Sequence, residues 1–282
     1  VVYFCEMKVL KRVFDFYIQS SIHVALSAYS LVQMTHFMFP IPNIKPVANF
    51  AFFGTIVGYN FVKYEALARA KSHRKRDKLK SIAVLSFLSF LAVGFYFFQL
   101  QRLAQMVSVA VFILTLLYTL PFFPNRKNAR NWAGVKIYIV SFCWVGVTLI
   151  LPILDAGISI TMDFYLKCMQ RFILIFVLIL IFEIIDLAND DPHLQTVPQQ
   201  IGVKRTKKLG YILLLIFCLL EFFNRNINGN FNFQFLPLII EIAIAIVIFL
   251  FLAFANYKRS KYYTSFWVES VPILWWWLVL VF

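Results

Sequence analysis

Four acidic residues stand close together in the string FEIIDLANDD, at the end of a long apolar run: Glu183, Asp186, Asp190 and Asp191. On a helix, Asp186 and Asp190 are four residues apart and project from one face. Two carboxylates one turn apart repel each other unless a cation lies between them. Mg²⁺ suits such a pair, because proteins usually hold it with one or two carboxylates plus the phosphates of a substrate. The spacing therefore favours a site for a metal and a phosphate.

A simpler interpretation is a solvated acidic helix end that offsets the basic run at residues 204–208. Acids at the carboxyl end of a helix oppose the helix dipole. This interpretation gives no reason for placing the acids there. Two further acids, Glu241 and Glu269, lie inside apolar runs and have no predicted partner.

The elements that carry these residues are predicted to be transmembrane helices. Of the 282 residues, 61% are hydrophobic and only 14% are charged, whereas soluble domains are about half apolar and about a quarter charged. The apolar runs are long enough to cross about 30 Å of hydrocarbon as helices. We predict an all-α, polytopic membrane bundle with spans at 13–34, 46–64, 81–100, 104–120, 135–152, 169–187, 209–223, 235–255 and 264–282.

The distribution of basic residues predicts the orientation. With the N-terminus inside, the predicted inner segments hold 22 of the 27 Lys and Arg residues. Basic residues collect in cytoplasmic loops. We therefore expect a multi-pass protein of a bacterial-type inner membrane, with the N-terminus in the cytoplasm and the C-terminus outside. The same distribution explains the net charge of +14 without a nucleic-acid partner.

The stretch EIIDLANDDPHLQTVPQQIGVKRTKKLGY (183–211) resembles the second aspartate-rich region of the UbiA superfamily of intramembrane prenyltransferases. In that family a D-x-x-x-D at a helix end precedes a loop of the form K-T-L-P-x-x-L-G. The upstream stretch LYTLPFFPNRKNARNWAGVK resembles the family's tyrosine-then-basic segment, with Tyr118, Arg126 and Lys127 in the matching places. Nine spans with the N-terminus inside are also the family's layout.

The family's first motif, N-D-x-x-D-x-x-x-D, is degenerate in this chain. Asn60 is present, but the aspartate positions hold Phe61, Tyr64 and Ala68. Glu65 is the nearest acid, one residue out of register and about 100° around the helix. Half of the metal cradle that the resemblance implies is missing.

The resemblance implies one domain, 1–282, of two facing half-bundles at roughly 13–120 and 135–282. It implies a prenyl diphosphate, a hydrophobic acceptor and membrane lipid as partners, with Mg²⁺ as cofactor. Asp186, Asp190 and Asn60 are then the catalytic candidates, and Glu65 joins the two aspartates as a metal ligand. Arg126, Lys127, Lys204 and Arg205 are the diphosphate candidates, and Tyr118, Glu183 and Asp191 are further site candidates.

Two functions remain open at this point. One is a Mg²⁺-dependent prenyltransferase acting on an aromatic or other lipid-soluble acceptor. The other is a catalytically silent homologue that binds lipid or serves as a structural membrane subunit, for which the missing first-motif aspartates argue. A transporter has little support, since we find no pair of helices broken by Gly or Pro near the membrane midplane.

Overall fold

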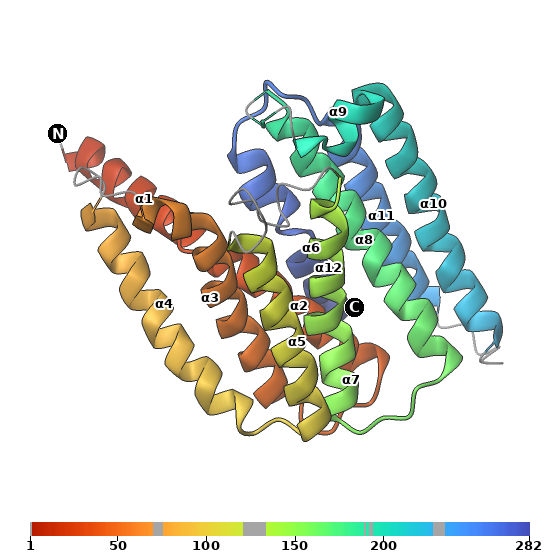
Figure 1. Ribbon diagram of the computed structural model, residues 1–282. Coiled ribbons are helices and arrows are strands. Elements are labelled where there is room, and N and C mark those ends of the chain that lie inside the picture. Colours follow the sequence, from red (N-terminus) through yellow and green to blue (C-terminus); the bar gives the residue numbers. More distant parts are fainter. Residues whose placement is uncertain (1, 70–75, 121–133, 189, 192–193, 228–234) are drawn as a thin grey trace.

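The structure is a computed structural model that describes residues 2–69, 76–120, 134–188, 190–191, 194–227 and 235–282 (Figure 1). Every regular element in these residues is helical, so the predicted all-α class is confirmed for them. The elements are α1 (Val2–Gln19), α2 (Ile22–Met38), α3 (Lys45–Arg69), α4 (Arg76–Phe97), α5 (Arg102–Thr119), α6 (Lys136–Val145), the π-helix η4 (Gly146–Ile150), α7 (Leu151–Asp155), α8 (Met162–Asp186), α9 (Val197–Ile201), α10 (Val203–Ile227), α11 (Phe235–Phe254), the π-helix η6 (Tyr263–Val268) and α12 (Val271–Val281).

Six helices of the described residues are long and apolar enough to cross a membrane. They run over Leu79–Phe97, Arg102–Thr119, Lys136–Asp155, Met162–Asp186, Leu236–Phe254 and Tyr263–Val281. Of the other helices predicted to span, α2 has only 17 residues, whereas α3 and α10 combine apolar runs with charged ends. The count of nine spans stays a prediction.

Helix α8 forms the centre of the bundle. Its residues Leu174, Val177 and Ile181 are fully buried, and they belong to a core shared with α2, α10, α11 and α12. A second core joins α2 and α3 to the helix that runs through η4 and α7. In Figure 1, α4 lies at one edge of the bundle and α10 at the other, with α8 between them.

Segments α6, η4 and α7 form one continuous helix, and Pro152 explains the π-helical turns inside it. Proline has no N–H group, so it cannot bond the carbonyl four residues earlier. That carbonyl belongs to Thr148, and it accepts a 2.7 Å hydrogen bond from the Thr35 hydroxyl of α2 instead. The freed backbone group thus ties this helix to α2.

The predicted continuous span 13–34 is wrong in one respect, because the structure breaks it at Ser20 and Ser21. Helix α1 ends at Gln19 and α2 begins at Ile22, while Ser21 has a left-handed backbone with φ of 64°. Such a conformation is costly for a residue other than glycine. Asn60 of α3 compensates for it, as described below.

The predicted span 169–187 also begins earlier in the structure, since α8 starts at Met162. This places Lys167 inside the helix, buried to 6% exposure. Two buried carboxylates, Glu221 of α10 and Glu241 of α11, form ion pairs with it. A charge at membrane depth is tolerated when it is paired in this way.

Candidate functional site

Asp186 and Asp190 lie at the end of α8. Asp186 is the last residue of the helix, and the Asp190 N–H donates a 2.9 Å hydrogen bond to the Asp186 carbonyl. This bond joins residues four apart, as in a helical turn, and holds the Asp190 backbone next to the end of α8. The Asp190 Oδ2 atom is buried and has no hydrogen-bond partner among the described residues. A buried carboxylate oxygen of this kind normally has a partner, and a cation would provide one.

Glu183, one turn earlier on α8, anchors the loop that follows. Its side chain is 2% exposed and accepts a 3.0 Å hydrogen bond from the N–H of Val197, the first residue of α9. The Gln199 side chain in turn donates to the Asp191 carbonyl at 3.2 Å. Helix α9 is therefore fixed against the end of α8, and Figure 1 shows it between that end and the start of α10.

Lys136 is a cation that the sequence analysis did not single out. It is the first residue of α6, and it lies close enough to Glu183 and Asp186 to interact with both electrostatically. Among Lys136, Glu183, Asp186 and Asp190 alone, acids outnumber bases three to one.

The chemistry of these donors fits Mg²⁺. Hard carboxylate oxygens are its preferred protein ligands. Within the described parts of the chain, no three His, Cys, Asp or Glu residues come together closely enough to hold a metal ion by themselves. Two carboxylates with an unpartnered oxygen suit an ion that takes its remaining ligands from a bound phosphate and water.

Asn60 lies at the break between α1 and α2. It is 4% exposed. Its Oδ1 accepts a 2.8 Å bond from the Ser21 hydroxyl, and its Nδ2 donates to the Ser20 carbonyl at 3.0 Å and to the Ser86 hydroxyl at 2.9 Å. The side chain thus holds α3 to the strained turn and to α4. Glu65 is half-buried farther along α3.

The predicted diphosphate residues are only partly described. Arg126 and Lys127 lie outside the described residues. Lys204 and Arg205 are exposed in the first turn of α10, directly after Gly202, where a φ of 79° redirects the chain from α9. They lie at the same end of the bundle as Asp186 (Figure 1).

A second polar group joins α3 to α6 and to Glu269, and the sequence analysis identified only parts of it. Glu269 interacts electrostatically with Lys63 and Tyr59 of α3. The Trp144 indole donates a 2.9 Å hydrogen bond to the Tyr59 hydroxyl, and the buried Tyr118 is a further neighbour of Tyr59. Glu269 and Glu241, which had no predicted partners, thus both face lysines.

Comparisons with known proteins identify the fold. No family model matches the chain, and no curated protein sequence does. A UbiA homologue from Aeropyrum pernix K1, in an apo structure, superposes with a TM-score of 0.64 and 15% identity over 94% of this chain and 98% of that one. A digeranylgeranylglyceryl phosphate synthase superposes with a TM-score of 0.56 and 15% identity, covering 96% of each chain.

A third solved structure is a UbiA homologue from Archaeoglobus fulgidus with bound Cd²⁺. Its TM-score is 0.55, its identity 11%, and the match covers 96% of each chain. Identities this low establish the fold alone. The resemblance predicted from residues 183–211 is confirmed at that level, since the chain folds as these homologues do.

Proposed function

We propose that this chain, with its UbiA-type fold, is an intramembrane prenyltransferase that moves a prenyl group from a prenyl diphosphate to a lipid-soluble acceptor. The observation that carries the proposal is the pair Asp186 and Asp190 at the end of α8, with a buried Asp190 oxygen that no described residue bonds. One of the proteins with a similar fold is a digeranylgeranylglyceryl phosphate synthase. This supports a reaction of the same general class.

In this proposal, Asp186 and Asp190 would hold Mg²⁺ at the end of the bundle where the donor diphosphate binds. The metal, when bound, supplies Lewis-acid stabilisation of the leaving group. Lys136, Lys204 and Arg205 supply positive charge at the same end of the bundle, with Arg126 and Lys127 as further candidates. Glu183 fixes α9 beside the two aspartates and so shapes the entrance for the diphosphate.

The bond changes are those of an allylic substitution. The bond between the first prenyl carbon and the diphosphate oxygen breaks, and its electron pair leaves on the diphosphate. The acceptor forms a new bond to that carbon and loses a proton. An apolar, aromatic interior keeps water from the carbon while it is cationic. Tyr59, Trp144 and Tyr118 are the aromatic groups that we assign to this region.

The first-motif residues have reduced roles in the proposal. Asn60 acts as a positioning residue, because its amide already holds α3 to the turn at Ser20 and Ser21. Glu65 remains the acid that would assist metal binding from α3. Because the first motif offers only Glu65 as a metal ligand, we expect slow turnover. The same weakness motivates the alternative of a silent homologue that binds the lipid diphosphate without transferring its prenyl group.

Calorimetry of the detergent-solubilised chain with geranylgeranyl diphosphate and Mg²⁺ tests the site. Asp186→Asn and Asp190→Asn should each weaken Mg²⁺-dependent binding by about tenfold or more, because a charge-assisted contact contributes about 1.5–3 kcal/mol. Asp155→Asn is the matched control, since its carboxylate accepts the Gln101 N–H from the end of α7. Unchanged affinity in both site variants would remove the assignment.

A second measurement separates the enzyme from the silent homologue. Pyrophosphate release is followed with the wild-type chain, Mg²⁺, geranylgeranyl diphosphate and a panel of aromatic and glycerol-based acceptors. Release that depends on both an acceptor and Asp186 supports the transferase. Tight diphosphate binding without release over the whole panel supports the silent homologue.

A further inference from the structure

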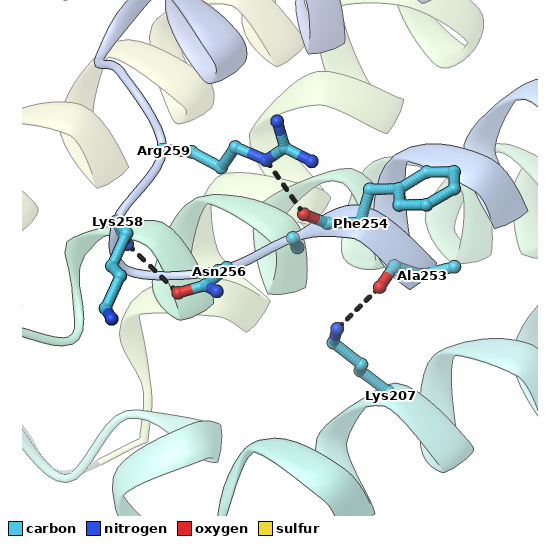
Figure 2. Close-up of a pocket in the computed structure, with 7 residues that line it drawn as sticks. Lys207, Ala253, Phe254, Asn256, Lys258 and Arg259 are labelled. Atoms are coloured by element: carbon cyan, nitrogen blue, oxygen red, sulfur yellow. Dashed lines mark hydrogen bonds between the residues drawn. The ribbon is translucent and has the colours of Figure 1, made fainter.

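A basic pocket lies between α10 and the turn that follows α11. Its volume is about 430 Å³, and its lining contains Lys207, Lys258 and Arg259 but no acidic residue. Figure 2 shows Lys207 and Arg259 bonded to the last carbonyl groups of α11, with Lys258 in the adjoining turn and its side chain extending away from these carbonyls. The pocket is distinct from the acids of α8, and none of the predicted site residues lines it.

The turn that carries two of the cations is held by its own hydrogen bonds. The Asn256 side chain accepts a 3.0 Å bond from the Lys258 N–H (Figure 2). The Asn256 backbone carbonyl accepts the Arg259 N–H at 2.9 Å. An asparagine that bonds the backbone two residues on forms a stable turn. Lys258 and Arg259 therefore start from a fixed backbone beside the end of α11.

The basic groups also cap the end of α11. Lys207 Nζ donates a 2.7 Å bond to the Ala253 carbonyl, and Arg259 Nε donates a 3.2 Å bond to the Phe254 carbonyl. These bonds neutralise carbonyls that would otherwise repel an anion. Lys207 keeps two further N–H donors and Arg259 its two terminal nitrogens, so both retain capacity for a ligand.

Helices α10 and α11 approach closely directly below the pocket. A Cβ added at Gly210 would lie 2.4 Å from the Leu252 side chain. Glycine thus permits the approach that brings Lys207, one turn away on α10, to the end of α11. Partial burial there lowers the pKa of the Lys207 ammonium. A bound anion would offset this cost.

An apolar stripe runs down α11 from the pocket. Phe254, Leu250 and Ile246 follow one another at four-residue intervals, with exposures of 59%, 46% and 53%. On the neighbouring α10, Ile212 and Leu215 are also exposed. Side chains at this spacing share one helix face. The pocket thus stands above a surface that suits hydrocarbon chains.

We propose that this pocket binds the phosphate of an anionic phospholipid, whose acyl chains lie along the stripe of α11 and α10. Three cations without a lining acid complement a phosphate, and basic residues at a membrane surface attract anionic lipids. The end of an apolar helix is also the depth at which headgroups lie. A free phosphate would use the basic pocket but would gain nothing from the stripe. This inference does not rest on the proposed enzymatic function.

The test measures lipid binding to the detergent-solubilised full chain by native mass spectrometry. Dioleoyl phosphatidylglycerol is titrated against wild type, the double variant Lys258→Gln with Arg259→Gln, and a control with Lys11→Gln and Arg12→Gln. The control removes Lys11 and Arg12, two adjacent, exposed basic residues that do not line this pocket. We expect the pocket variant to bind the lipid about 30-fold more weakly, and the control to bind it within about twofold of wild type.

Two further arms identify the ligand and check the fold. Dioleoyl phosphatidylcholine should bind weakly to all three proteins. Millimolar inorganic phosphate should leave phosphatidylglycerol bound, whereas displacement would overturn the lipid assignment in favour of a free phosphate. Equal losses in the pocket and control variants would also overturn it, because the effect would then reflect net charge. Thermal unfolding confirms that each variant is folded, and Arg259→Lys, which keeps the charge, should retain most of the binding.

Discussion

Both polar atoms of the Asn60 side chain are engaged in hydrogen bonds to other protein groups. Three partners share them: the Ser21 hydroxyl, the Ser20 carbonyl and the Ser86 hydroxyl. All of these contacts hold helices together at a point where the chain turns through a left-handed residue. The position that the family pattern associates with a metal motif thus carries a structural amide in this chain.

Replacing Asn60 with alanine should lower stability markedly. Each buried polar group left without a partner costs about 1–3 kcal/mol. The Ser21 hydroxyl and the Ser20 carbonyl lose their bonds to Asn60, whereas the Ser86 hydroxyl keeps its bond to the Ile82 carbonyl. We expect a fall of several degrees in the thermal unfolding midpoint of the solubilised protein. Gln99→Ala is the control, since Gln99 is exposed and should leave the midpoint unchanged. A midpoint for Asn60→Ala equal to that of wild type would contradict the described hydrogen bonds.

The spacing of Asp186 and Asp190 could be read from the sequence alone. Asp186 and Asp190 are one turn apart on any helix, so their relation follows from spacing alone. Lys136 was not identified, because its proximity to Asp186 depends on how α6 packs against α8. The partners of Asn60 were missed for a similar reason, since no periodicity indicates a break at two serines inside an apolar run.

At the scale of elements, the apolar runs predicted most helices. They did not predict that a buried lysine could be paired inside one of them. The predicted span 169–187 starts after Lys167, and an unpaired lysine in hydrocarbon is costly. In the structure, Glu221 and Glu241 lie on two other helices and pair with it. Gln170 adds a 3.1 Å hydrogen bond to Glu241. Such a cluster is visible only after the helices are packed.

We expect Lys167→Met to destabilise the bundle of α8, α10 and α11 by about 3–5 kcal/mol, because it leaves two buried carboxylates without their cation. The triple variant Lys167→Met, Glu221→Gln, Glu241→Gln removes all the buried charges and should recover much of the loss. Thermal unfolding in detergent measures both. Arg102→Met, at an exposed cation, should change stability by less than about 0.5 kcal/mol. A neutral effect of Lys167→Met alone would show that the cluster does not bear charge.

At the scale of the whole molecule, basic groups gather at one end of the bundle. Lys204 and Arg205 begin α10 at that end, next to the loop after α8, and the pocket of Lys207, Lys258 and Arg259 lies at the carboxyl end of α11. The predicted inner segments contain all five of these residues. In the predicted orientation, a donor diphosphate and an anionic lipid headgroup would both be bound from the cytoplasmic surface.

This orientation is tested with single cysteines in a background whose four native cysteines are replaced by serine. Ser260, in the turn after α11, and Ser159, between α7 and α8, are both exposed. Because basic loops stay in the cytoplasm, a membrane-impermeant maleimide should label Ser260→Cys in inverted vesicles and Ser159→Cys in intact spheroplasts. Both variants should react fully after detergent is added, which controls for burial of the thiol. The reverse labelling pattern would contradict the predicted orientation. It would place the acids of α8 outside, where they would not meet a cytoplasmic prenyl diphosphate.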